Sequence, residues 1–285
     1  MRKLFLSIAV AALVTNSAKA EVTDCQEILS VPVIITTQGI HCLKSNKVSS
    51  ATSGNLIDIT VNNVTIDLNG FKLGGSGAGP ATEAFGIFAQ DRKNITIRNG
   101  SIRGFLRGVF LDQDAGTSSG HLLEDLLFDG NRDIGALVEG DGNIIRNNRV
   151  VNTGSGDPGT FAVGFWLIGA SDTVIADNVI SGTSETGASR GILVSDSALI
   201  EVRGNTILDA KDGVFGKNGI ELGNSTDVTI IDNRILNATG TGTNGIIDLN
   251  NTSTGVSCFD NTILGFTTAT NGCDLEAGTN PPLGL

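Results

Sequence analysis

Glu221 and Asp248 are the two acidic residues whose spacing best suits chemistry. Glu221 lies in a Gly-Ile-x-Leu segment that starts at Gly219, and Asp248 lies in the equivalent segment that starts at Gly245. If equivalent segments stack, the two backbones lie ~4.8 Å apart. Two carboxylates this close do not both stay ionised at low cost, so one holds a proton or a cation lies between them. The first outcome suits general acid–base catalysis on a glycosidic bond, and the second suits Ca²⁺.

The side-chain direction of Asp248 follows from the cost of burial. With Ile247 and Leu249 as the inward pair, Asp248 points outward, because a carboxylate without a partner in an apolar core is too costly. Charged residues of both signs lie in the turns beside the same strands, namely Arg190, Asp196 and Lys217. The two basic residues offer a site for the carboxylate of a uronic acid. The alternative is a solvated acidic pair that Lys217 partly neutralises.

A sequence repeat positions these residues. A glycine followed by a short apolar strand recurs seven times, at intervals of 22 to 29 residues, at Gly86, Gly108, Gly135, Gly164, Gly191, Gly219 and Gly245. Between these glycines an asparagine recurs two residues before an Ile or Val, at Asn148, Asn178, Asn205, Asn233 and Asn261. A fixed period of this size predicts that each unit stacks on the next in a solenoid.

The repeat units consist of short strands. Apolar residues alternate with polar ones in residues 63–67, 94–98 and 227–230, which predicts strands with one buried face. No run of ten or more residues after residue 20 has a helical stripe. We therefore predict an all-β chain in which each strand pairs in parallel with its copy one coil on. The recurring asparagine then stacks on itself, and the amides satisfy one another in a ladder.

Four cysteines predict two disulfides if the chain reaches an oxidising compartment. Of the three pairings, the positions favour Cys25 with Cys42 and Cys258 with Cys273, because each bridge closes a short loop at one end of the rod. Solenoid ends expose unpaired backbone and need caps. We interpret residues 21–53 as an N-terminal cap, 54–265 as the repeats, and 266–285 as a C-terminal cap and tail.

Residues 1–20 have the features of a signal peptide, with a basic start, a short apolar stretch and a small-residue cleavage site. This predicts a secreted or periplasmic protein. Cleavage removes three basic residues and no acid, so the formal charge changes from −11 to −11 − 3 = −14. So acidic a chain disfavours nucleic acid and anionic lipid as partners. No later segment approaches the ~20 apolar residues of a transmembrane helix.

The segment 63–71 (Asn-Val-Thr-Ile-Asp-Leu-Asn-Gly-Phe), together with the repeated Gly-Ile and Asn-x-Ile steps, resembles secreted bacterial right-handed parallel β-helix proteins of the pectin-lyase-like superfamily. Residues 34–43 resemble the N-terminal cap of that group. The resemblance covers residues 30 to 275. It implies a right-handed parallel β-helix, for which we expect about nine coils with a disulfide at each end.

The resemblance is specific for the fold rather than the activity, because the superfamily includes lyases, hydrolases, epimerases and proteins with no known chemistry. The motifs of polygalacturonase-like hydrolases, pectate lyases and alginate epimerases are absent from the sequence. Catalysis therefore stays open. If the protein is an enzyme, the resemblance implies a polysaccharide lyase or a glycoside hydrolase.

In this resemblance, the Gly-Ile-x-Leu strands form the sheet whose outer face is the floor of the binding cleft. Alternation turns the second residue after each glycine outward, which gives a column of Phe88, Phe110, Leu137, Trp166, Leu193 and Glu221. The column spans roughly 24 Å and is mostly apolar. Three interpretations stay open: a platform on which Phe88, Phe110 and Trp166 stack against sugar rings, an interface with further copies of the chain, or a surface covered by residues 74–84 or 153–160.

Asp232 and Asp260 form a second calcium candidate, because they occupy equivalent positions on adjacent coils. Ca²⁺ is the one cofactor that the sequence suggests. We predict an exported protein that binds a polysaccharide or surface glycan along the outward column, and that cleaves it if Glu221 and Asp248 are catalytic. The alternative is a noncatalytic structural or surface protein that self-associates through the same stripe. The chain is then a monomer or a homo-oligomer.

Overall fold

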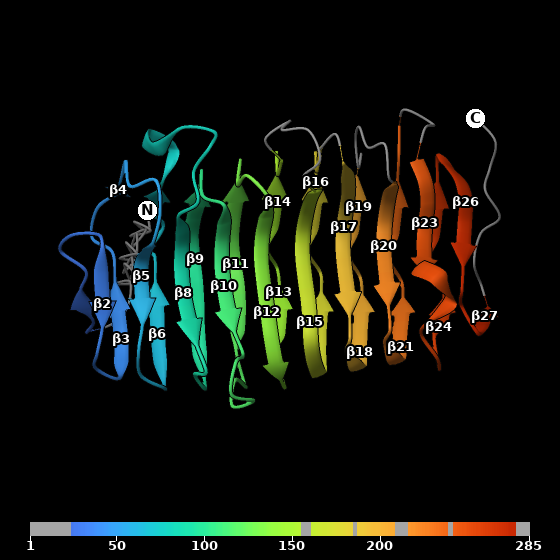
Figure 1. Ribbon diagram of the computed structural model, residues 1–285, viewed down its shortest axis with the longest axis horizontal. Coiled ribbons are helices and arrows are strands. Elements are labelled where there is room, and N and C mark those ends of the chain that lie inside the picture. The colour runs from blue at the N-terminus through green and yellow to red at the C-terminus, as the bar shows by residue number, and fades with distance from the viewer. Residues whose placement is uncertain (1–23, 155–160, 185–186, 209–215, 239–241, 278–285) are drawn as a thin grey trace, which may run out of the picture.

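The computed structural model describes residues 24–154, 161–184, 187–208, 216–238 and 242–277. The predicted signal peptide lies outside these described residues. The strands follow one another along a single rod from the N-terminal to the C-terminal end (Figure 1), in about eight turns, close to the predicted number. Each strand pairs in parallel with its equivalent one coil on, as the repeat predicts.

Three parallel sheets run along the rod. The first sheet contains β2 (Val33–Ile35), β5 (Asn55–Ile59), β8 (Phe85–Gln90), β10 (Arg107–Asp112), β12 (Ile134–Asp141), β15 (Phe161–Ala176), β17 (Ala188–Ser195), β20 (Lys217–Gly223), β23 (Gly242–Asp248) and β26 (Phe266–Asn271). The second contains β1 (Gln26–Glu27), β3 (Gly39–Cys42), β6 (Val64–Asp67), β9 (Ile95–Arg103), β11 (Leu122–Asp129), β13 (Ile144–Arg146), the end of β15, β18 (Ala198–Arg203), β21 (Thr226–Ile231), β24 (Ser257–Phe259) and β27 (Leu275–Ala277). The third contains β4 (Lys47–Val48), β7 (Lys72–Gly74), the ends of β9 and β11, β14 (Arg149–Val151), β16 (Val179–Ser181), β19 (Thr206–Leu208), β22 (Arg234–Leu236) and β25 (Thr262–Leu264).

Helical structure among the described residues is limited to two single turns, η1 (Ser76–Ala78) and η2 (Leu249–Asn251). Neither turn is long or apolar enough to cross a membrane, and the described residues contain no other helix that is.

The core lies inside the coil, between the three sheets. In the first sheet the residues one and three positions after each glycine point inward, and Ile192 and Val194 in β17 are fully buried. The largest fully buried side chains are Phe105, Phe128 and Phe165. Burial of these apolar side chains stabilises the fold by roughly 25 cal/mol per Å² of apolar surface removed from water.

A ladder of buried asparagines links five successive coils at one corner, as predicted. The side-chain oxygen of Asn205 accepts hydrogen bonds from the backbone N–H and the side-chain amide of Asn178, at 3.0 Å each. The Asn205 amide donates to Ile175 O and to the side-chain oxygen of Asn233. The pattern repeats along Asn148, Asn178, Asn205, Asn233 and Asn261. The ladder satisfies backbone groups that the tight corner leaves without sheet partners.

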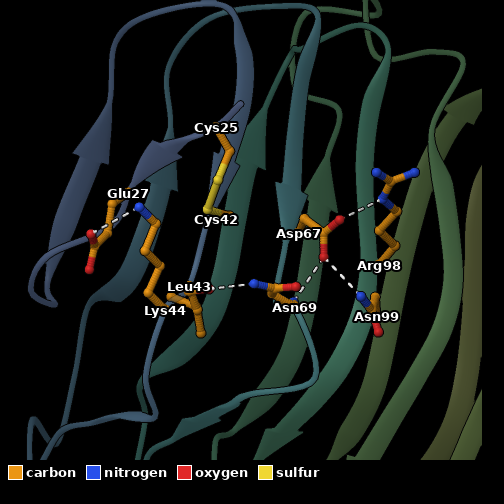
Figure 2. Close-up of a disulfide and its surroundings, with 9 residues drawn as sticks. All are labelled: Cys25, Glu27, Cys42, Leu43, Lys44, Asp67, Asn69, Arg98 and Asn99. Carbon is orange, nitrogen blue, oxygen red and sulfur yellow. Dashed lines mark hydrogen bonds and ion pairs between the residues drawn. A yellow bond between two sulfur atoms is a disulfide. The ribbon is translucent and has the colours of Figure 1, made fainter. Parts of the chain in front are cut away.

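The two predicted disulfides are present, one near each end of the rod. Cys25 bonds to Cys42, and Cys258 bonds to Cys273. Beside the first bridge, Asp67 accepts hydrogen bonds from Arg98 and Asn99 one coil on (Figure 2). Each bridge closes a short loop at its end of the rod and so reduces the conformational entropy of the unfolded chain.

The repeated glycines of the first sheet mark a close contact between coils. A Cβ on Gly191 would lie 2.7 Å from the carbonyl oxygen of Gly219 on the next coil and 2.5 Å from Cγ2 of Ile207 in the third sheet. The same approach to the next coil's carbonyl recurs at Gly86, Gly108, Gly135, Gly164, Gly219 and Gly245. A side chain at these positions does not fit.

Replacement of one such glycine tests this contact. We expect Gly191→Ala to lower the free energy of unfolding by about 1–3 kcal/mol, because the added methyl overpacks the corner. Gly223→Ala is the matched control, since a Cβ at Gly223 meets no atom within 4 Å, and we expect a change within about 0.5 kcal/mol. Urea denaturation followed by the fluorescence of Trp166 measures both. Equal effects of the two substitutions would contradict the close-contact account.

Candidate functional site

The candidate site is the outer face of the first sheet, from β5 to β23, here called the outer face. The predicted outward column is in register on neighbouring strands, with Phe88 beside Phe110 and then, coil by coil, Leu137, Trp166, Leu193 and Glu221. Asp58 continues the column at one end, and Ile247 continues it at the other. Side chains more than 100 residues apart in the sequence therefore form one continuous row.

Trp166 lies outside the main core, as the alternation predicts. It is half-buried in a separate apolar cluster with Ile134, Leu137, Val163 and further partly buried neighbours. Its indole N–H donates to Ser195 Oγ at 2.9 Å, and its ring meets Phe161 edge to face with centroids 5.6 Å apart. These contacts fix the orientation of the only tryptophan in the chain.

Sequence reasoning missed a second column of side chains on the outer face. Its members lie one residue before each glycine. It contains Phe85, Arg107, Ile134, Val163, Arg190, Asn218 and Asn244, paired in register. Strict alternation assigns these residues to the interior. The backbone instead bends at the glycine, which itself faces the corner. The glycine that recurs in each repeat is the sequence signal that could have indicated this bend.

The N-terminal part of the outer face carries an aromatic and basic group. Phe85, Phe88 and Phe110 pack with ring centroids 5.4 to 6.0 Å apart. The Arg107 guanidinium lies over two of these rings, 4.4 Å from the Phe110 centroid and 5.4 Å from the Phe85 centroid. Burial lowers the pKa of Arg107, an effect that the carboxylates of Asp133, Glu139 and Asp112 oppose.

Asp112 and Glu139 lie beside this group, four residues after their glycines on neighbouring strands β10 and β12. Glu139 accepts a hydrogen bond from the Gln113 backbone N–H at 2.9 Å, and Asp112 accepts one from the Gln90 amide at 2.8 Å. Burial raises the pKa of Glu139, and the charge of Asp112 adds to the increase. A carboxyl with a raised pKa is suited to proton donation. Sequence reasoning did not propose either acid as a site residue.

The C-terminal part of the outer face carries a polar network. Arg190 Nε lies 2.7 Å from Glu221 Oε2, with the Arg190 side chain 17% and the Glu221 side chain 4% exposed. Asn218 donates to the same carboxylate at 2.7 Å, and Asn244 donates to Asn218 at 3.0 Å. The partners of Glu221 are thus a guanidinium and an amide, and no second carboxylate among the described residues is paired with it.

The predicted pairing of Glu221 with Asp248 is wrong. Glu221 lies beside Ile247, and Asp248 lies beside the inward Leu222, so the alternative register does not form. Asp248 is buried but has partners, since it accepts hydrogen bonds from the Ser253 backbone N–H at 2.9 Å and from Ser253 Oγ at 2.8 Å. These two bonds offset the cost of burial that had favoured an outward direction.

The flanking charged residues are placed differently from the prediction. Arg190 lies within β17, and Lys217 begins β20, so neither is a turn residue. The acidic pair that Lys217 was expected to neutralise in part is absent. Asp196 does occupy a turn directly after β17, with φ of 50°, and it accepts a hydrogen bond from Asn224 at 2.6 Å.

The second calcium candidate consists of turn residues. Asp232 and Asp260 have φ of 55° and 52°, in the left-handed region that Asp tolerates. They precede the ladder residues Asn233 and Asn261, so their position follows from the corner geometry. No group of three or more His, Cys, Asp or Glu able to hold a metal ion occurs within the described ranges. The first candidate is lost with the pairing of Glu221 and Asp248. Ca²⁺ binding at Asp232 and Asp260 stays a prediction.

Of the two segments proposed to cover the outward column, residues 155–160 of the second lie outside the described residues. The first packs at a corner, where Gly75 contacts Phe105 and Ser76 contacts Gly104. Arg132 Nη1 donates to Thr82 O in this segment at 3.1 Å.

A family model of the right-handed β-helix region matches residues 10–180 and 86–280. The chain therefore belongs to the right-handed β-helix family, in agreement with the resemblance noted in the sequence. A search of the curated proteins finds no significant sequence match.

Solved structures with a similar fold include two tailspike proteins and a glucanase. The Dettilon tailspike protein gp208 is 15% identical with a TM-score of 0.54, over 90% of this chain and 58% of that chain. The enzymatically active domain of tailspike protein 2 of bacteriophage CBA120 is 16% identical with a TM-score of 0.54, over 82% and 38%. The catalytic domain of a GH87 α-1,3-glucanase in complex with nigerose is 12% identical with a TM-score of 0.50, over 88% and 62%. The chain spans 38% to 62% of the length of these proteins, and the similarity shows the fold alone.

A double-mutant cycle measures the strength of the polar network. We expect Arg190→Gln and Glu221→Gln to show a coupling energy of about 1–3 kcal/mol in urea denaturation, because the pair is largely shielded from water. The matched control is the pair Arg203 and Glu201 on the second sheet, whose side chains are 47% and 43% exposed. We expect less than about 1 kcal/mol there. A coupling energy no larger than that of the control would show that water screens the Arg190–Glu221 pair.

Proposed function

We propose that this protein binds a polysaccharide along the outer face of its first sheet. The observation that carries the proposal is the row of apolar and aromatic side chains on that face, flanked by the polar groups of its two ends. Sugar rings stack on aromatic and apolar surfaces, and their hydroxyls bond to charged and amide groups at the edges. A row that rises by one strand spacing per coil suits an extended chain rather than a compact ligand.

The rigidity of the face supports this function. Trp166 is held by Ser195 and Phe161, and Arg107 is held over two phenylalanine rings. A surface that is ordered before binding loses little conformational entropy when a ligand arrives. The fold likeness to an α-1,3-glucanase that was solved with nigerose agrees with a carbohydrate partner.

The two disulfides support an oxidising location for the protein, either outside the cell or in the periplasm. An extracellular polysaccharide is available there. The carboxylates of Asp112 and Glu139 provide groups for acid–base chemistry if the bound glycan is also cleaved.

A glycan array, probed with Ca²⁺ and with a chelator, tests the proposal. We expect the wild-type protein to bind at least one polysaccharide, and Trp166→Ala to weaken that binding about tenfold or more, as loss of a central aromatic contact does. The matched control is Ile144→Ala, which removes a 39% exposed apolar side chain from the second sheet. We expect this variant to bind as the wild type does. Circular dichroism checks that both variants are folded.

Light scattering separates the alternative in which the face joins copies of the chain. We expect the wild type and Trp166→Ala to have the same mass in solution. A wild-type oligomer that Trp166→Ala dissociates, with no glycan bound by either protein, would replace polysaccharide binding with self-association.

A further inference from the structure

We propose that the outer face selects uncharged polysaccharides and rejects anionic ones. The inference rests on the proposed function and specifies its substrate class. It also reverses the expectation that the basic residues of this face receive the carboxylate of a uronic acid. The reason is that Arg190 is already paired with Glu221 and that the face as a whole has more carboxylates than guanidinium groups.

The charge balance of the outer face is negative. Among the described residues that point outward from β5 to β23, four are carboxylates and two are guanidinium groups, namely Asp58, Asp112, Glu139, Glu221, Arg107 and Arg190. Asp133 and Lys217, each two residues before a glycine, add one charge of each sign and leave the balance unchanged. The whole chain carries a formal charge of −11, so the wider field also repels a polyanion.

Arg190 is occupied by Glu221. The distance of 2.7 Å between Arg190 Nε and Glu221 Oε2 is that of an ion pair, and Asn218 donates a hydrogen bond to the same carboxylate oxygen. A ligand carboxylate would have to compete with a carboxylate that is held in place by the fold. It would also approach Glu221 itself, whose side chain is only 4% exposed and lies against the Arg190 guanidinium.

Arg107 is balanced in a similar way. Its guanidinium lies over the Phe110 ring, and the charges of Asp133, Glu139 and Asp112 oppose the lowering of its pKa by burial. An anionic sugar that stacked on the phenylalanine group would place its carboxylate near these acids. An uncharged sugar meets no such repulsion, and its hydroxyls donate to Asp112 and Glu139.

The test compares neutral and acidic oligosaccharides of equal length. Neutral probes are oligomers of an α-glucan, a β-glucan and a mannan, and acidic probes are oligomers of galacturonate and of alginate. We measure dissociation constants by ligand-observed NMR at 20 mM and at 150 mM salt. We expect at least one neutral oligomer to bind about tenfold or more tightly than either acidic one, with the difference largest at low salt because like charges are then least screened.

Glu221→Gln tests the local cause. It releases the positive charge of Arg190, so we expect the affinity for the galacturonate oligomer to rise about three- to tenfold at low salt. The matched control is Glu201→Gln, which makes the same charge change beside Arg203 on the second sheet. We expect that variant to leave the affinity unchanged. Glu139→Gln, beside Arg107, provides a second variant on the outer face if Glu221→Gln does not fold.

The outcomes separate the two proposals. Tight binding of an acidic oligomer by the wild type, with no neutral oligomer bound, would overturn the inference and leave polysaccharide binding intact. An equal gain in Glu221→Gln and Glu201→Gln would also overturn it, because the effect would then belong to the net charge and not to the outer face. If no oligosaccharide of either kind binds, the proposed function itself fails.

Discussion

The register between successive coils is the constraint on which the rest of the structure depends. Two features hold it. At one corner, the asparagine ladder gives each coil's backbone N–H a side-chain acceptor from the next coil, as between Asn178 and Asn205. Along the first sheet, each repeated glycine lies against a backbone carbonyl oxygen one coil on, as Gly191 does against that of Gly219. A one-residue slip would place a side chain where only a hydrogen fits and would leave buried amides unpaired. Both costs oppose slippage, so equivalent positions line up along the rod.

Because the register is fixed, the side chains of the outer face form columns across successive coils. They do not form a local sequence motif. Arg190 and Glu221 are 31 residues apart in the sequence, yet their charged atoms lie 2.7 Å apart because their strands are neighbours. The face also changes along the rod, from phenylalanines with Arg107, through the apolar cluster around Trp166, to the amide and ion-pair network at Glu221. A polymer lying along these columns meets a different environment at each unit. This is how a one-dimensional repeat can distinguish the positions of an otherwise uniform chain.

The sequence predicts the fold well because the signals that set it repeat. Period and alternation identify the inward Ile and Val residues, the outward Trp166 and the asparagine ladder, and the cysteine positions identify both disulfides. The site was predicted less completely, since its details depend on departures from the repeat. The bend at each glycine turns the preceding residue outward, which alternation alone does not indicate. Asp248 was assigned outward on the cost of an unpaired buried carboxylate, but Ser253, five residues later, supplies two hydrogen bonds that the pattern does not reveal. Asp112 and Glu139 were not proposed as site residues, because an acid near the end of a strand is most often a turn residue.

The apolar cluster around Trp166 also bears on how the outer face works. Ile134 and Val163 are fully buried although they lie on the outer side of the sheet, so this face has a small core of its own. Such packing holds the exposed edge of Trp166 in one orientation and keeps the Arg190–Glu221 pair in a partly dry environment, where charges interact more strongly than in water. An uncharged ring that settles on this surface covers apolar atoms without removing the counter-ion of either guanidinium. An anionic ring gains the same apolar contact but adds a charge to a face that already has more carboxylates than guanidinium groups. In the proposed binding mode, the apolar row therefore supplies affinity, and the charges beside it supply the selection.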